Sequence, residues 1–481
     1  MGEGISHTTS NAYDTSWVAR LSLDYPSHNF GEAANWLRRN QNADGSWGGS
    51  ILHYHDRFVS TLSSIIALKM LGHGYDDAHR IALGEAYLWH EGNRISHDSH
   101  DTIAFPLVAL ALVKEAEKLG LDVPPSIGDV EHIEKKLNML SGNPERVRHT
   151  SLIFSYEAIR MYLMDNGRLN IAEANGSVGA SPSATAAYAL DHGNDAAASI
   201  RYLDEVMHKQ GDGGVAFIDP FDVFEIAWGL NHLFMGNLIE PDMPEVRRLL
   251  DILWKKWVQG KGITFSSHFH VYDLDDSAVI FKLLKWGGYP VTADFLDYYE
   301  EENHFRCYPG EIGLSLSVNV RALDAIQYAS NHPKFEGWAD KIVALLRHSD
   351  LKGNLWFDKW HVSPYYLTAI TILSALGFAD ELLVSRVKWI LKTQHRDGGW
   401  GYYRQSTAEE TAYVLLALFH WDEHVERIDP EIIHNGAGYL LEHINDRQYP
   451  ELWIGKSLYT PRFLVEAVML SALNQYTRYC V

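Results

Sequence analysis

The stretch SRVKWILKTQHRDGGWG, residues 385–401, places a helical apolar pattern directly before a glycine-rich turn that ends in tryptophan. A second copy of the turn, QNADGSWG at residues 41–48, follows the similar segment FGEAANWLRRN. Glycine permits the chain reversal, and Asp or Ser can cap the helix that follows. With a degenerate third copy, QGDGG at residues 210–214, these turns indicate a repeated helix-turn-helix unit.

The sequence between these turns is mostly helical in pattern. Segments such as FVSTLSSIIALKML (58–71) and EETAYVLLALFHW (409–421) repeat apolar residues every three or four positions, whereas alternating strand patterns are scarce. No low-complexity linker divides the chain. We therefore predict an all-α fold of two closely packed (α/α) barrels, in which inner and outer helices surround a cavity.

Composition excludes several classes of protein. The net charge of −21 over 481 residues argues against binding to nucleic acid or to an anionic membrane surface. The two cysteines, Cys307 and Cys480, are too few for a disulfide framework and suit a reducing compartment. The start, MGEGISHTTS, has no signal-peptide pattern, and no uncharged stretch is long enough to span a bilayer. We expect a cytoplasmic protein without stable membrane insertion.

An acidic cluster gives the clearest chemical signal. Asp273, Asp275 and Asp276 lie within four residues in HVYDLDDSAVIFKLL (270–284), at the start of an apolar helical segment. Neighbouring carboxylates repel, so the cluster should retain at least one proton near neutral pH. Such a group could protonate a poor base such as an alkene. The alternative is that the aspartates only cap a helix in water or bind a cation.

Histidines accompany acidic residues at two places, in His97-Asp98-Ser99-His100-Asp101 and at His268 and His270. Neither set has the spacing of a zinc site. We interpret both as structural or solvated polar residues, so the sequence defines no metal ligands.

Seven segments, in this order, resemble the class II terpene cyclases, and more narrowly the two-domain class II diterpene cyclases. They run nearly from end to end of the chain: residues 11–19 (NAYDTSWVA), 41–48, 55–68 (HDRFVSTLSSIIAL), 181–186 (SPSATA), 221–228 (FDVFEIAW), 273–276 (DLDD) and 453–459 (WIGKSLY). The resemblance implies a γ domain at residues 20–225, inserted into a β domain made of residues 1–19 and 226–481.

In that family the substrate is a linear isoprenoid diphosphate, usually geranylgeranyl diphosphate, and the enzyme protonates its terminal alkene. The resemblance implies that Asp275 is the proton donor, that Asp273 and Asp276 tune it, and that Asn319 hydrogen-bonds the donor carboxyl. We find no aspartate-rich class I motif, so the product should keep its diphosphate. A downstream class I terpene synthase or phosphatase would then act on it.

The diphosphate needs local positive charge in an acidic chain. Lys456 is the first candidate for this contact, and Arg57 and Lys359 are weaker ones. The resemblance implies that Mg²⁺ accompanies the diphosphate.

Aromatic faces can stabilise carbocations without supplying a nucleophile. The aromatic residues that flank the matched motifs are therefore expected to line the cavity: Trp228, Phe265, Phe269, Trp360, Tyr365 and Tyr366.

Phe154 and Phe217 fall where relatives that make copalyl skeletons carry a His and an Asn that hold the terminating water. Neither phenylalanine can act as a base. The resemblance therefore implies a rearranged, halimadane-like or clerodane-like product, such as halimadienyl or kolavenyl diphosphate, over copalyl diphosphate.

Two alternatives stay open. The same chemistry on farnesyl diphosphate would give drimenyl diphosphate. An (α/α)-barrel glycoside hydrolase would instead use acidic residues as acid and base, and would need a second carboxylate across its cleft.

Overall fold

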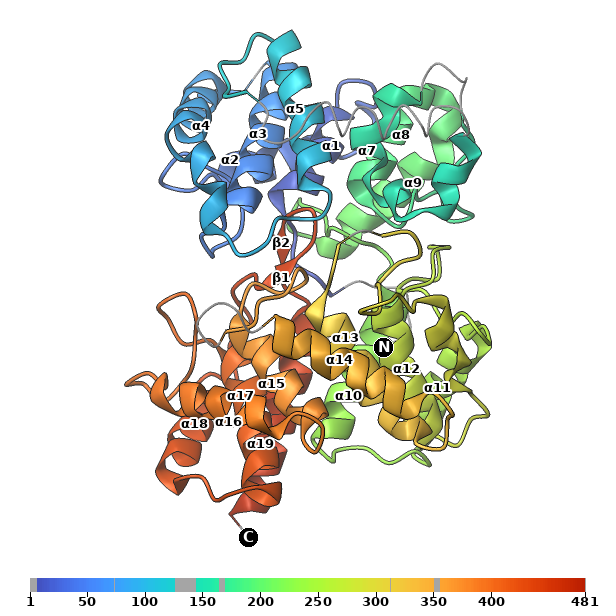
Figure 1. The fold of residues 1–481 in the computed structure, drawn as a ribbon. Coiled ribbons are helices and arrows are strands. Elements are labelled where there is room, and N and C mark those ends of the chain that lie inside the picture. The colour runs from blue at the N-terminus through green and yellow to red at the C-terminus, as the bar shows by residue number, and fades with distance from the viewer. Residues whose placement is uncertain are drawn as a thin grey trace.

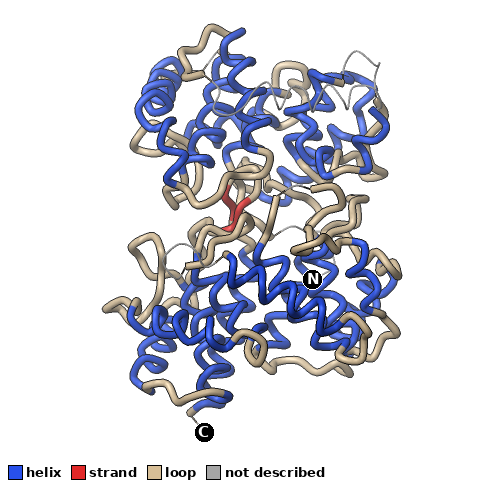
Figure 2. The backbone as a smooth tube through the Cα atoms, viewed as in Figure 1, coloured by secondary structure: helices blue, strands red, loops and turns tan. Residues whose placement is uncertain are grey.

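The computed structural model describes residues 7–72, 74–125, 144–163, 169–311, 313–349 and 355–480. Two helical lobes are stacked one on the other, with two short strands at the waist between them (Figure 1). Figure 2 shows that helices form most of both lobes and that loops gather at the waist. No helix in the described ranges is long and apolar enough to cross a bilayer.

The upper lobe is built around a closed ring of helices. Each ring helix packs against the next in chain order, and α8 returns to α1. The ring consists of α1 (Ala12–Arg20), α3 (Tyr54–Leu71), α5 (Phe105–Lys118), α7 (Tyr156–Ile159) and α8 (Pro182–His192). Outside it lie α2 (Gly31–Arg39), α4 (Asp77–Glu91) and α9 (Ala197–Gln210).

The lower lobe repeats this plan with a longer ring. The last helix, α19, packs against both α17 and α10 and so closes the circle. The ring comprises α10 (Asp222–Met235), α12 (Leu274–Trp286), α13 (Leu316–Ile326), α15 (Pro364–Ala375), α17 (Ala408–His424) and α19 (Arg462–Tyr479). The outer helices are α11 (Pro244–Lys256), α14 (Phe335–His348), α16 (Asp380–Lys392) and α18 (Pro430–Glu442).

In the described ranges, short 3₁₀ segments lie between these helices: Gly92–His97, Pro144–His149, Ser151–Ser155, Arg160–Tyr162, Gly193–Ala196, Ala293–Tyr298 and Gln327–Ala329.

The two tryptophan turns are structural repeats. Trp47 and Trp400 are both fully buried. The Trp47 indole donates to the Leu37 carbonyl at 2.8 Å, and the Trp400 indole donates to the Ile390 carbonyl at 2.9 Å. Each turn is thereby anchored to the outer helix that precedes it, so the sequence repeat corresponds to one repeated outer-to-inner helix connection.

A β-hairpin connects the lobes. Its strands, β1 (Trp453–Ile454) and β2 (Leu458–Tyr459), are antiparallel. The Ile103 backbone N–H donates to the Gly455 carbonyl at 2.8 Å, and the Leu458 N–H donates to the Asp56 carboxylate at 3.1 Å. The hairpin tip is therefore built into the upper lobe, although the chain around it belongs to the lower one.

The predicted domain boundaries need two corrections. Residues 12–19 were assigned to the lower domain, but they form α1, which is wholly buried against α3 and α8 of the upper lobe. The predicted division at residue 225 falls inside α10, which starts at Asp222 and packs against α12 and α19. The lower lobe therefore begins at about the first residue of α10.

Candidate active site

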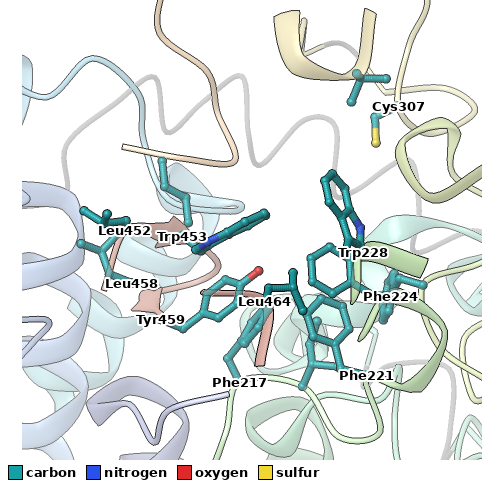
Figure 3. Packing of buried hydrophobic residues seen from close by; sticks show 14 of the residues in the cluster. Phe217, Phe221, Phe224, Trp228, Cys307, Leu452, Trp453, Leu458, Tyr459 and Leu464 are labelled. Atoms are coloured by element: carbon teal, nitrogen blue, oxygen red, sulfur yellow. The ribbon is translucent and has the colours of Figure 1, made fainter. Parts of the chain in front are cut away.

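A cavity of about 270 Å³ lies at the junction of the lobes. The upper lobe supplies Ile103, Ala104, Ser151, Leu152, Phe154 and Ser155, and most of the remaining wall comes from the lower lobe and the hairpin. Its aromatic lining consists of Phe154, Phe217, Phe221, Phe224, Phe265, Phe269, Tyr308, Trp360, Trp453 and Tyr459. Figure 3 shows part of this group, with Phe217, Phe221, Trp453 and Tyr459 close together.

The rings meet one another at stacked and edge-on angles. Phe217 stacks on Tyr459 at a centroid distance of 3.9 Å, and Phe265 stacks on Phe269 at 4.3 Å. Phe154 meets Phe217 edge-on at 6.1 Å. Such a wall offers π faces to a cation and few groups that could attack it.

All three aspartates of the cluster line this cavity. Asp273 is the N-cap of α12, where its Oδ1 accepts the backbone N–H of Asp276 at 2.8 Å. The cluster therefore occupies the first turn of a ring helix. Asp273 and Asp276 are buried, whereas the Asp275 side chain keeps 16% of its surface exposed. Asp275 is thus the carboxyl most open to a ligand.

The cluster retains protons because burial disfavours its charged forms. Burial raises the pKa of Asp273 to about 8. Burial and the neighbouring Asp273 and Asp275 carboxyls raise the pKa of Asp276 well above its ordinary value. Burial also raises the pKa of Asp275, to about 6, against the lowering influence of Arg321. Asp275 is therefore the strongest acid of the three.

Arg321 is a site residue that the sequence analysis missed. Its Nε lies 3.3 Å from Oδ1 of Asp275, and its guanidinium lies 3.5 Å from the centroid of the Trp228 ring. A terminal nitrogen donates to the Tyr366 hydroxyl at 2.5 Å. A signal for it existed, because an arginine inside the apolar pattern of α13 is unusual in a buried helix.

Known proteins resemble this chain along almost its whole length. No family model matches the chain. It is 35% identical to the "Type B diterpene cyclase" of Mycobacterium tuberculosis, over 98% of this chain and 96% of that protein. It is 30% identical to the ent-copalyl diphosphate synthase of a Streptomyces species, over 97% and 92%. The ent-copalyl diphosphate synthase structure from Streptomyces platensis superposes with a TM-score of 0.80 at 27% identity, covering 98% of this chain and 96% of that one.

The chain belongs to the class II diterpene cyclases. The glycoside hydrolase alternative falls with this result, because the similarity to a diterpene cyclase covers 98% of the chain.

The structure contradicts the predicted role of Asn319 in this cyclase. Its Oδ1 accepts the Phe305 N–H at 2.8 Å, and its Nδ2 donates to the carbonyls of Phe305 and Ser315 at 2.9 and 2.7 Å. Both amide hydrogens are therefore used by the backbone, and none is left for the Asp275 carboxyl. Asn319 instead holds the loop that leads to the cavity residues Cys307 and Tyr308.

Lys456 was predicted to bind the diphosphate, and the structure contradicts this too. The side chain has no exposed surface. Its Nζ donates to the Phe154 carbonyl, Glu157, Ser181 and Ser183 at 2.6–2.8 Å. These partners use all three ammonium hydrogens, so Lys456 joins the hairpin tip to the upper lobe rather than to a ligand.

The other two predicted cations differ from each other. Arg57 is buried in the tryptophan turn, where it donates to Ser46 Oγ at 2.5 Å and to the Gly49 carbonyl at 2.8 Å, so it does not line the cavity. Lys359 pairs with Glu311 at 2.5 Å and lies 4.7 Å from the Trp360 ring centroid. Both of these neighbours line the cavity, which leaves Lys359 beside its wall.

The predicted aromatic lining is only partly what the structure shows. Phe154, Phe217, Phe265, Phe269 and Trp360 are in the cavity wall. Trp228, Tyr365 and Tyr366 are not. Trp228 and Tyr366 contact Arg321 instead, and Tyr365 stacks on Trp389 at 4.4 Å. Their positions in the sequence, next to the matched motifs, did not reveal which way their rings point.

Among the described residues, one group of three could offer ligands to a metal ion: His53, His55 and Asp98. Two of its three ligand atoms are imidazole nitrogens, whereas Mg²⁺ takes oxygen ligands and retains water. His55 Nδ1 also hydrogen-bonds Asp98 Oδ2 at 2.7 Å. This group does not fit Mg²⁺, and Asp98 has a structural role in holding the start of α3.

Proposed function

We propose that this cyclase converts geranylgeranyl diphosphate into a bicyclic diterpenyl diphosphate, and that Asp275 starts the reaction by protonating the terminal alkene. The observation that carries the proposal is the position of Asp275, the most acidic and most exposed member of a proton-retaining cluster, on the wall of an aromatic cavity. Family membership supports the reaction class, and the cavity supports a cationic intermediate.

In the proposed first step the alkene π pair forms a C–H bond with the Asp275 proton while the O–H bond breaks. The bond's electron pair stays on the carboxylate, and a tertiary carbocation forms in the substrate. Attack by the next two alkenes closes two rings. The diphosphate takes no part in this step, so it is kept in the product for a downstream class I synthase or phosphatase.

We propose a rearranged skeleton because the wall carries Phe154 and Phe217 where the resemblance implies that copalyl-forming relatives carry a His and an Asn holding the terminating water. Their rings meet edge-on with their centroids 6.1 Å apart and offer no lone pair to a proton. A bicyclic cation that is not deprotonated promptly can undergo hydride and methyl shifts. Loss of a proton to water from the rearranged cation, with the C–H pair forming a new alkene, would then give a halimadane-like or clerodane-like diphosphate.

We also propose that the diphosphate lies towards Lys359, because its side chain is partly exposed beside the cavity wall whereas Lys456 has no exposed surface. Mg²⁺ would neutralise its charge while being held mainly by phosphate oxygens and water, as is usual for this ion.

The test is product analysis. Purified protein is incubated with geranylgeranyl or farnesyl diphosphate, and the products are dephosphorylated and identified by mass spectrometry and NMR. A rearranged bicyclic C20 alcohol is expected. An unrearranged bicycle would correct the product to copalyl diphosphate, and preference for the C15 substrate would correct it to drimenyl diphosphate. Linear alcohols alone from both substrates would overturn the proposal.

A further inference from the structure

We infer that Arg321 is the positioning residue of the proton donor: it holds Oδ1 of Asp275, directs the acidic proton on Oδ2 into the cavity, and stabilises the carboxylate that proton transfer creates. This inference rests on the proposed function of Asp275. It assigns to Arg321 the role that the sequence analysis had given to Asn319.

The geometry at the carboxyl separates its two oxygens. Oδ1 is buried and faces Nε of Arg321 at 3.3 Å, and neither atom has a hydrogen-bond partner. The exposed part of the side chain therefore lies away from Oδ1, which leaves Oδ2 towards the cavity. A proton on Oδ2 faces a substrate, whereas a proton on Oδ1 would face a guanidinium.

The guanidinium is fixed before substrate arrives. It lies 3.5 Å from the centroid of the Trp228 ring and donates to the Tyr366 hydroxyl, and the Arg321 side chain is 6% exposed. Tyr366 in turn stacks on His361 at 4.3 Å and meets Tyr413 edge-on at 5.0 Å. Trp228 and Tyr366, which do not line the cavity, thus hold the Arg321 guanidinium beside Asp275.

A fixed cation makes the neighbouring acid stronger. The guanidinium favours the carboxylate over the carboxylic acid, so proton transfer to a weakly basic alkene becomes less unfavourable. No reorganisation is needed when the negative charge appears on Asp275. The positive charge faces the carboxyl and the Trp228 ring rather than the cavity lining, which limits its repulsion of the carbocation.

Other charged groups also act on Asp275. Asp358 raises its pKa, and Lys359 lowers it after Arg321. Burial raises the pKa values of Asp273, Asp276, Cys307, Tyr366 and Tyr459, which keeps all five protonated at neutral pH. Arg321 is therefore the cation whose removal should change the acidity of Asp275 most.

The sign of the effect can be measured. The active form of Asp275 is protonated, so kcat falls as pH rises above its pKa. Arg321→Gln removes the charge, which raises that pKa and weakens the acid. We expect the alkaline limb of the kcat profile to move up by about one pH unit while the plateau kcat falls about tenfold. KM should change less than about twofold, because Arg321 is not among the residues that line the cavity.

Two further variants separate positioning from folding. Arg321→Lys keeps the charge and should return the limb towards its wild-type pH. Arg386→Gln is a matched control, because Arg386 is also a buried arginine on a tryptophan, 4.0 Å from the Trp356 ring centroid, but lies in the outer helix α16. Arg386→Gln should lower the stability of the protein without moving the alkaline limb of the kcat profile.

An alkaline limb that stays in place in folded Arg321→Gln would overturn the inference. If that variant does not fold, Tyr366→Phe takes its place, because it removes the hydroxyl that accepts a hydrogen bond from the guanidinium. The alkaline limb should then move up in pH by less than in Arg321→Gln. An alkaline limb that stays in place in Tyr366→Phe would also overturn the inference. A wild-type protein that forms no bicyclic product would instead refute the proposed function itself.

Discussion

Asp275 differs from its two neighbours because only its carboxyl has both an adjacent guanidinium and an exposed face. Replacing it with Asn keeps the shape and removes the proton. Product formation by Asp275→Asn should fall at least about 100-fold, the usual contribution of a general acid. The rate is measured as bicyclic product per enzyme, with circular dichroism to verify folding.

Asp380→Asn provides the control for Asp275→Asn, because Asp380 lies in the first turn of the outer helix α16. Its activity should stay near wild type. Comparable losses in the two variants would show that the Asp275 effect is not chemical.

The double substitution Phe154→His with Phe217→Asn tests how the reaction ends. The ring of residue 154 lies 4.5 Å from Nζ of Lys456, so an introduced histidine should stay neutral and able to accept a proton. Product should move towards an unrearranged bicycle, measured by NMR of the dephosphorylated mixture. An unchanged product distribution would exclude these positions as the control point of termination.

At the residue scale, the sequence predicted what depends on local spacing and missed what depends on contacts across space. The three aspartates are adjacent in the chain, so their shared acidity could be predicted. Lys456 lies in a matched motif, but its partners Glu157 and Ser181 are more than 270 residues away in the chain. Motif position alone could not show that these partners use its hydrogens.

At the element scale, the acidic cluster is a modified helix N-terminus. Ser181 and Thr407 cap α8 and α17 as Asp273 caps α12, each accepting a backbone N–H from the residue three positions later.

A further turn before α8 was not predicted from the sequence because it lacks both Gln and Trp. It makes the same contact, however, since the Val178 N–H donates to Thr185 as the Trp47 N–H donates to Thr61. Repeated backbone geometry therefore extends beyond the repeated sequence.

The hairpin gives an element-scale prediction about stability. Lys456→Met leaves the Glu157 carboxylate without its cation, and neither side chain has exposed surface. Breaking such a buried pair should lower the free energy of unfolding by about 3–5 kcal/mol, measured by urea denaturation. Adding Glu157→Gln should recover part of the loss.

An exposed ion pair calibrates this prediction. Arg347 and Glu381 have 55% and 58% of their side-chain surface exposed, so Arg347→Ala should cost less than about 1 kcal/mol. A Lys456→Met protein as stable as Arg347→Ala would contradict the role of Lys456 in holding the hairpin tip to the upper lobe.

At the scale of the whole molecule, the buried acid cluster makes stability depend on pH. The folded pKa of Asp273 is about 8, above its value in an unfolded chain. The folded protein therefore holds a proton that the unfolded chain has released, and this stability is lost as pH rises through 8. Burial lowers the pKa values of His53 and His232 to about 4 and 3. These histidines therefore change the stability of the protein only below about pH 6.5.

We predict that Asp273 alone lowers the free energy of unfolding by about 2 kcal/mol between pH 6.5 and 8.5, and that Asp276, whose pKa is also raised well above its ordinary value, adds to this fall. Asp273→Asn removes one of these two titrating carboxyls and keeps an N-cap residue, so it should make this slope shallower. Urea denaturation at both pH values measures it. A slope as steep in Asp273→Asn as in wild type would contradict the assignment to this carboxyl.

The two-ring architecture was predictable because apolar periodicity and repeated turns are properties of sequence segments. The lobe to which α1 belongs was not. Its residues Asp14 and Ser16 are polar yet buried, and the family pattern placed them with the other domain. Only their partners across the chain, such as Ser183 and Ser63, show where the helix packs.

The most direct test of the central claim is turnover of geranylgeranyl diphosphate in D₂O, followed by mass spectrometry of the intact product. Protonation by an exchangeable carboxyl predicts a bicyclic product that gains one deuterium per molecule, keeps its diphosphate, and is absent with Asp275→Asn. A product that contains no deuterium, or that has lost its diphosphate during cyclisation, would contradict proton-initiated cyclisation by Asp275.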